Sequence, residues 1–322
     1  MLKRLKNIQT PLKVFISLGI MAFVFLRLDL KEFKEVVSQI DITFWGYAIV
    51  LTLAQFFLLS LRWQILINIG QYRMNYLQSL QVTLASFLAN TLFIATISGI
   101  AVRIALALQY GSSVFKAIFA TGIDRFLTLF ALTIFSSIFI PSLSNYLDGS
   151  MYKNTVIYIG IITFILVVLT PLITLFILKK VPALSKSKGR INSGVRYITI
   201  LINSRKILFK LILISLVAQL FFFIAIYLLS ISASVNLGFL QIMTVLPVIT
   251  LIASLPISIG GWGVREGAFV YGLGLLGVPM ETAFLVSIQI GLISMLTIIF
   301  AGIPAILSEH NFYTFKNCFS KK

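Results

Sequence analysis

The chain has 322 residues, of which 59% are hydrophobic and 11% are charged, and its mean hydropathy is +1.04. A soluble protein has about a quarter of its residues charged, so this composition excludes an ordinary soluble fold and indicates an integral membrane protein. The 26 Lys and Arg outnumber the 9 Asp and Glu, and the net charge is +17. In a membrane protein such an excess is typical of cytoplasmic loops that face anionic lipids, and it does not indicate a nucleic-acid partner.

The apolar residues fall in runs long enough for membrane-spanning helices, since about 20 helical residues cross the hydrocarbon core. The first run, 14–28, follows Lys3, Arg4 and Lys6 and has no small-residue cleavage site, which predicts an uncleaved first span. Further long runs lie at about 43–61, 77–97, 116–141, 154–178, 206–230, 239–257 and 281–307, and shorter ones at about 99–110 and 263–277. These runs predict an all-α polytopic membrane protein in which residues 1–322 form a single transmembrane domain.

Basic residues predict which side of the membrane each loop occupies. The loop 179–210 carries nine Lys and Arg and no acidic residue, so we expect it to be cytoplasmic. The loop 29–42 carries four acidic residues and is then outside, and Arg62 with Arg73 returns the chain to the inside. Both termini are predicted to be cytoplasmic, with the protein in the cytoplasmic (inner) cell membrane. Within 179–205, apolar residues recur at helical spacing, which predicts an amphipathic helix on the anionic inner leaflet.

Two short apolar pieces determine the topology. Only an even number of crossings fits between Arg73 and the basic loop, yet three clear spans lie there. Residues 98–110 reach about 20 Å of a roughly 30 Å core, so we expect 77–97 to enter, turn at Ser98-Gly99 and return. The same count predicts a second re-entrant hairpin from the opposite face, with its turn at 259–263. Six full spans with two re-entrant helical hairpins is the preferred interpretation, and eight full spans is the alternative.

The two halves of the chain share a pattern. Residues of about 77–141 and 239–307 each contain a glycine-bearing turn, an arginine, a short apolar limb that ends at Gly111 or Gly277, and a long span. The predicted orientations of the two halves are opposite, which predicts an inverted repeat. Inverted repeats with broken helices are typical of secondary transporters, whose substrate site lies at the repeat interface.

Five charged residues lie inside the predicted membrane segments, where each charge costs at least about 2.5–3.5 kcal/mol and needs a partner or a function. Asp124 is expected to pair with Arg103 or Arg265, because its neighbour Arg125 points about 100° away on a helix. By the same reasoning, Glu266 is a candidate partner for an ion pair with Arg125. Three cations and two anions leave one positive charge that needs a ligand.

Arg103 and Arg265 are predicted to hold a phosphate, because a guanidinium matches two phosphate oxygens with parallel hydrogen bonds. Gly260, Gly261 and Gly263 precede a short helix whose N-terminal N–H groups favour an anion. The two carboxylates would balance the arginines or meet a cationic headgroup. The alternative is that the five charges form a closed network that only locks the hairpins to the spans.

Four polar residues form a stripe on the first limb of the first hairpin. Ser79, Thr83, Ser86 and Asn90 stand at i, i+4, i+7 and i+11 and therefore share one helix face. This stripe either lines a hydrated cavity or makes hydrogen bonds between helices.

Enzyme chemistry is disfavoured by the residues that it would require. The chain has one histidine, His310, and one cysteine, Cys318, both near its end, and two intramembrane acids, so no metal site is predicted. It contains neither a Gly-x-Ser-x-Gly elbow nor a Walker loop. We expect no cofactor and no enzymatic activity.

Three motifs carry a resemblance to a known family. They are Ser98-Gly99-Ile-Ala-Val-Arg103, Asp124-Arg125 at the start of the next long span, and Pro256-Ile-Ser-Ile-Gly-Gly-Trp-Gly-Val-Arg-Glu-Gly267. The chain resembles the transmembrane domain of the lysylphosphatidylglycerol synthase/flippase family from about Lys6 to Leu307. The resemblance implies a flippase-like domain that moves a phospholipid, an aminoacyl-phospholipid or a polyprenyl-phosphate lipid between leaflets.

Two features set this chain apart from the family pattern. Members that make lysyl-lipid carry a soluble aminoacyltransferase domain after the membrane part, and we expect none here because the chain ends at Lys322. Ser98 stands where the family usually has glycine, and Ile100 where an acidic residue is frequent. A cationic headgroup is therefore less strongly implied.

These observations predict a lipid translocator whose partners are a membrane phospholipid or polyprenyl-phosphate lipid. Two other functions fit the sequence. One is a non-catalytic membrane subunit that presents a lipid to a separate partner transferase. The other is an ion-coupled transporter of a small solute that uses the carboxylate of Asp124.

Overall fold

The computed structural model of the chain describes residues 28–70, 72–92, 96–144, 158, 165, 197–201, 203–254 and 263–307. All regular secondary structure in these residues is helical, which confirms the predicted all-α class. The described ranges contain four helices long and apolar enough to cross a membrane: α3 (Thr43–Ile67), α6 (Val114–Leu143), α9 (Arg205–Ser232) and α13 (Met280–Leu307). The spans predicted at 14–28 and 154–178 lie almost entirely outside the described residues.

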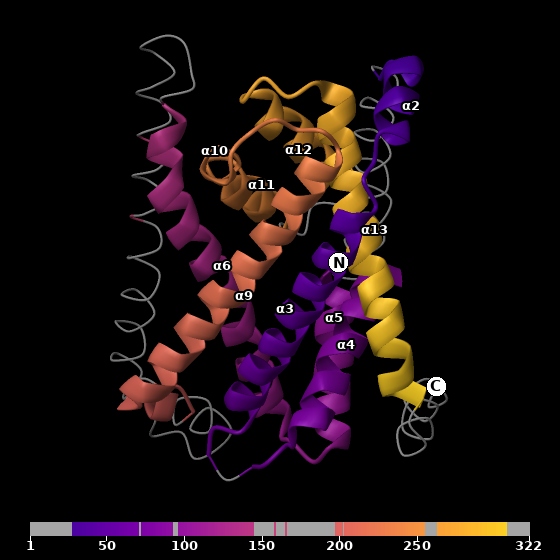
Figure 1. Cartoon of the computed structure of the whole chain (residues 1–322). Helices are drawn as coiled ribbons and strands as arrows, with labels where there is room; N and C mark the ends of the chain where they lie inside the picture. The colour runs from indigo at the N-terminus through magenta and orange to yellow at the C-terminus, as the bar shows by residue number, and fades with distance from the viewer. Residues whose placement is uncertain are drawn as a thin grey trace, which may run out of the picture.

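The long helix α3 packs along α9 (Figure 1). The buried apolar residues form two large cores and two small clusters. One core joins α9 and α13 to the second hairpin through residues such as Phe223, Phe269 and Val286. The other joins the ends of α3, α5 and α6 through residues such as Trp63 and Ala117. The charged residues between these cores belong to the candidate site.

The first re-entrant hairpin consists of α4 (Tyr76–Leu92) and α5 (Thr96–Gln109), which pack against each other. Figure 1 shows both limbs in the half of the molecule where α6 begins. With 14 residues, α5 is about 21 Å long, too short to cross a roughly 30 Å core. This length favours a hairpin over a full crossing.

The turn predicted at Ser98-Gly99 is wrong, because both residues lie inside α5 and the connection precedes Thr96. They serve helix packing instead. The Ser98 hydroxyl donates to the Ala89 carbonyl at 2.8 Å, and the Gly99 N–H donates to Oδ1 of Asn90 at 2.9 Å. A Cβ at position 99 would collide with the backbone carbonyl of Ser86, so the close approach of α4 and α5 depends on glycine.

The second hairpin consists of α10 (Phe239–Met243), α11 (Leu246–Ala253) and α12 (Val264–Gly274). The limb predicted as one run over 239–257 is divided into α10 and α11, and Pro247 stands at the start of α11. In Figure 1 these helices occupy the half of the molecule opposite to α4 and α5. The predicted turn at 259–263 lies outside the described residues except for Gly263. With 11 residues, α12 is about 17 Å long, which disfavours the eight-span alternative.

The short limbs α5 and α12 end in the same way. Gly111 and Gly277 both have positive φ, 90° and 80°, a conformation that glycine adopts at no steric cost. In each case the glycine N–H bonds to the carbonyl three residues earlier, and the next N–H bonds to the carbonyl five residues earlier. This is the Schellman cap. The two short limbs therefore share one cap, and the inverted repeat over 77–141 and 239–307 stays a prediction.

Acidic and basic residues lie at opposite ends of the bundle. At the acidic end, the N–H of Asp29 bonds to Glu281, and the N–H of Asp41 bonds to the Ser232 carbonyl at the end of α9. The exposed carboxyl of Asp41 accepts the N–H of Thr43, which holds the pKa of Asp41 below its usual value. The basic end carries Arg73, Lys116, Arg205, Lys206 and Lys210.

The amphipathic segment predicted at 179–205 is described only in part. Residues 197–201 are helical, and Tyr197 and Leu201 are buried against the second core. The Tyr197 hydroxyl donates to the Leu66 carbonyl at 2.7 Å, which fastens this segment to the end of α3. Its described part therefore packs on protein, and contact with anionic lipids stays a prediction.

This arrangement predicts that the turns after α5 and after α9 are reached from opposite sides of the membrane. In a Cys318→Ser background, Ser113→Cys should react with a membrane-impermeant maleimide only from the cytoplasmic side. Asn236→Cys should react only from the outside, because both positions are exposed at opposite ends. Labelling of both cysteines from one side in sealed vesicles would contradict the hairpin topology.

Candidate functional site

Asp124 on α6 is the centre of a buried network of charged and hydroxyl side chains. Its Oδ1 accepts a hydrogen bond from Nε of Arg62 at 2.8 Å. Its Oδ2 accepts one from Nη1 of Arg103 at 2.5 Å. The predicted pair of Asp124 with Arg103 is therefore confirmed, whereas its predicted pairing with Arg265 is wrong.

Arg62 is the site residue that the sequence analysis missed. It lies in α3 with only 2% of its surface exposed, although the sequence suggested a cytoplasmic loop residue. Its two terminal nitrogens donate to the hydroxyls of Ser215 at 3.0 Å and Thr128 at 2.8 Å. Arg62 thus connects α3 to α6 and α9 in a single set of hydrogen bonds.

Arg103 connects the first hairpin to the same carboxylate. Its Nε and Nη2 donate to the Ser86 hydroxyl on α4 at 3.3 and 3.1 Å. Its guanidinium carbon lies 4.8 Å from the centroid of the buried Trp63 ring, within the range of a cation–π interaction. The hydrogen bonds and the aromatic face hold Arg103 in one orientation.

Arg125 adds a further positive charge beside this network. It interacts electrostatically with Arg103, Asp124 and Arg62. Its Nε is buried and has no hydrogen-bond partner in the described part of the chain. The predicted partner, Glu266, is wrong, because Glu266 pairs with Arg265. Three arginines around one aspartate give a local charge of 3 − 1 = +2.

A second charged centre lies at the start of α12. Nε and Nη2 of Arg265 donate to Oε1 of the fully buried Glu266 at 3.1 and 2.6 Å. Oε2 of Glu266 accepts the N–H of Gly263 at 2.5 Å, and the Ser287 hydroxyl lies 3.5 Å from Oε1. The anion at this helix N-terminus is thus the chain's own carboxylate. Gly260 and Gly261 lie outside the described residues.

The Arg265 guanidinium also packs on α13. A Cβ at Gly291 would lie 2.8 Å from Nη1 and 2.9 Å from the guanidinium carbon of Arg265. A side chain at position 291 would therefore displace the arginine. Glycine at this position is required for the present contact between α12 and α13.

The polar stripe of α4 makes hydrogen bonds between helices. The Ser79 hydroxyl donates to the Ser60 carbonyl of α3 at 2.7 Å, and Ser86 and Asn90 accept hydrogen bonds from α5. The buried hydroxyl of Thr83 has no partner among the described residues. The interhelical alternative thus accounts for three of the four residues, and the lining of a hydrated cavity stays a prediction.

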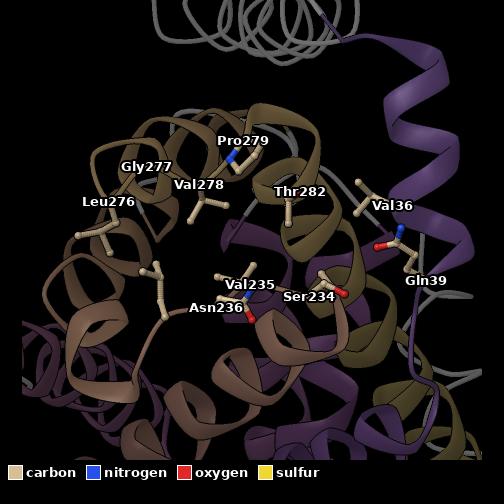
Figure 2. Close-up of a pocket in the computed structure, with 12 residues that line it drawn as sticks. Val36, Gln39, Ser234, Val235, Asn236, Leu276, Gly277, Val278, Pro279 and Thr282 are labelled. Carbon is tan, nitrogen blue, oxygen red and sulfur yellow. The ribbon is translucent and has the colours of Figure 1, made fainter.

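A separate cavity of about 370 Å³ opens at the acidic end of the bundle (Figure 2). It lies between α2 (Leu30–Ser38), the residues after α9 and the turn between α12 and α13. Its polar lining is uncharged and comes from Gln39, Ser234, Asn236 and Thr282. None of the predicted site residues lines this cavity. Among the described residues, no three His, Cys, Asp or Glu gather in a way that could hold a metal ion.

Apolar spans, two broken-helix hairpins and buried charges define a polytopic α-helical membrane protein with an intramembrane polar site. The sequence profile described as "Lysylphosphatidylglycerol synthase TM region" matches residues 11–302. The chain therefore belongs to this family, which indicates a function related to membrane lipids. No curated protein sequence matches the chain.

The network predicts a large loss of stability when its one carboxylate is neutralised. Asp124→Asn leaves two buried arginines without a counter-charge and should lower the free energy of unfolding by about 3–5 kcal/mol. A second change, Arg62→Gln, should restore part of this loss, because it removes one of the unpaired cations. Arg265→Gln should restore none of it, since Arg265 belongs to the other centre. Equal recovery by both, measured by equilibrium unfolding in mixed micelles, would contradict the assigned pairs.

Proposed function

We propose that this protein is a lipid translocator of the flippase-like class, which moves a phospholipid, an aminoacyl-phospholipid or a polyprenyl-phosphate lipid between leaflets of the cytoplasmic membrane. The observation that carries the proposal is the net positive centre around Asp124, formed by residues of α3, α5 and α6. A desolvated excess of positive charge in a membrane protein favours an anionic ligand. The phosphate of a lipid headgroup has the matching charge.

The depth of this centre supports the proposal. Asp124 lies eight residues after Lys116, which is about 12 Å along α6 and closer to the membrane midplane than to the interface. The hairpin α4–α5 brings Arg103 to this depth without crossing the membrane. An ion that reaches the midplane from either leaflet meets a fixed counter-charge there, and such a site lowers the barrier to crossing.

An apolar space beside α3 supports a lipid as the ligand. It has a volume of about 470 Å³ and is lined by Ala54, Phe57, Leu58, Leu61, Tyr76 and Phe221. Leu61 directly precedes Arg62 in α3, so this space lies on the same turn of helix as the charged centre. Acyl or prenyl chains fit such a lining, whereas a small polar solute does not.

The contacts of Asp124 disfavour the ion-coupled transporter. Both of its oxygens accept hydrogen bonds from guanidinium groups. Two guanidinium charges bonded to one carboxylate oppose its binding of a proton or a sodium ion, which an ion-coupled transport cycle requires. We therefore propose a non-enzymatic translocator in which Asp124 orients the arginines, with N- and C-termini in the cytoplasm.

The test is leaflet exchange of labelled phospholipids in liposomes that contain equal amounts of folded wild type or variant. Arg125→Lys in this centre keeps the charge but loses the planar guanidinium that can donate to two phosphate oxygens, so exchange should fall by about tenfold while folding is retained. Arg205→Lys at the exposed start of α9 is the matched control and should exchange at the wild-type rate. Absence of exchange by the wild type with every lipid tested would contradict translocation and favour presentation of lipid to a partner transferase.

A further inference from the structure

Within the described ranges, Asp124 is the one carboxylate paired with the arginines of this positive centre. The sequence has nine acidic residues, of which seven lie in the described ranges. The other two, Asp148 and Glu309, flank the apolar runs 116–141, 154–178 and 281–307 and do not interrupt them. A buried charge of +2 that no described carboxylate offsets attracts an anion from outside the chain.

Arg125 is the arginine best placed to meet that anion. Arg62 and Arg103 each use three nitrogens on Asp124 and hydroxyl groups, whereas Nε of Arg125 has no partner within the described residues. Positions 118, 122, 125 and 129 stand at i, i+4, i+7 and i+11 and share one face of α6. Ile118 and Leu129 on this face are 48% and 42% exposed. Arg125 thus lies between the buried network and the outer face of the bundle.

Gly122 leaves space on the same face, one helical turn before Arg125. It is exposed, and a Cβ built on it would meet no atom of the described residues within 4 Å. A glycine inside a helix costs about 1 kcal/mol relative to alanine. In the described part of the chain no packing contact explains this glycine, in contrast to Gly99 and Gly291, where a Cβ would collide with neighbouring atoms.

We propose that the open face of α6 at Gly122 and Arg125 binds the phosphate of a lipid that enters sideways from the bilayer, and that this site prefers a phosphomonoester to a phosphodiester. A phosphomonoester carries a charge of about −1.5 to −2 at neutral pH and balances the local charge of +2. A phosphodiester carries one negative charge and leaves the site unbalanced. This inference rests on the proposed function and specifies the substrate class of the same charged centre.

The buried Trp63 beside Arg103 provides a reporter of binding. The sequence has three tryptophans, and Trp45→Phe with Trp262→Phe leaves Trp63 alone. Protein in phosphatidylcholine nanodiscs is titrated with phosphatidic acid and, separately, with phosphatidylglycerol of the same acyl chains, and Trp63 fluorescence is followed. Phosphatidic acid should bind at least about tenfold more tightly, and its advantage should decrease below about pH 6 as the monoester is protonated. Equal affinities for the two lipids would overturn the proposal.

Three variants locate the site. Arg125→Gln should reduce the preference for phosphatidic acid to about twofold or less, because it removes one positive charge. Gly122→Leu fills the open space without changing any charge and should weaken binding of both lipids about tenfold or more. Gly46→Leu is the matched control, since Gly46 is also exposed in a helix with no atom near its Cβ, and it should bind like the wild type. Unchanged binding by Gly122→Leu would overturn the site.

Inorganic phosphate separates a lipid ligand from a free anion. If inorganic phosphate changes Trp63 fluorescence as strongly as phosphatidic acid and depends equally on Gly122, the site is one for free phosphate, and the lipid assignment is overturned. Leaflet exchange is measured independently of binding. Phosphatidic acid binding with the expected preference, but without exchange, would contradict translocation and leave the phosphomonoester site supported.

Discussion

The carboxylate of Asp124, shared between Arg62 and Arg103, is the interaction on which the rest of the structure depends. Each oxygen accepts one guanidinium, and Ser86 and Ser215 extend the contacts to α4 and α9. Five helices therefore meet at one acidic side chain. Neither arginine is stable in an apolar interior without this partner. The position of α4–α5 is thus determined by charge as much as by packing.

The two halves of the chain share a backbone plan but differ in how their charges are satisfied. Both short limbs end in Schellman caps at Gly111 and Gly277, and both hairpins carry an arginine. Arg265 pairs with its sequence neighbour Glu266, which also caps α12, so these two charges balance each other. Arg103 pairs outside its own hairpin, in a centre that keeps excess positive charge. A ligand-dependent role is therefore better placed in the first half.

Run lengths and the need for intramembrane partners were sufficient to predict the four long helices of the described part, the short helices between them and the pair of Arg103 with Asp124. Arg62 was missed because an arginine near the end of an apolar run resembles a cytoplasmic loop residue. The sequence indicates how deep a residue lies in the membrane, but not which face of its helix is buried. The pairing of Arg125 with Glu266 failed for the same reason. The turn at Ser98-Gly99 was misplaced because Gly99 serves close packing, a role that one sequence does not distinguish from a turn.

The glycines of the transmembrane part divide into two groups, and the division bears on where a ligand can bind. A Cβ at Gly99, Gly272 or Gly291 would collide with an adjoining helix or with a side chain packed on it, so these residues let short limbs approach their neighbours closely. Such contacts compensate for the small apolar area that a half-length helix buries. Gly122 makes no such contact with the residues that the structure describes, although it lies in a long helix that would be more stable with alanine. The space beside Gly122 is retained at a cost in helix stability, and it lies one turn from Arg125, whose Nε has no hydrogen-bond partner in the described part of the chain. A ligand explains this space better than packing does.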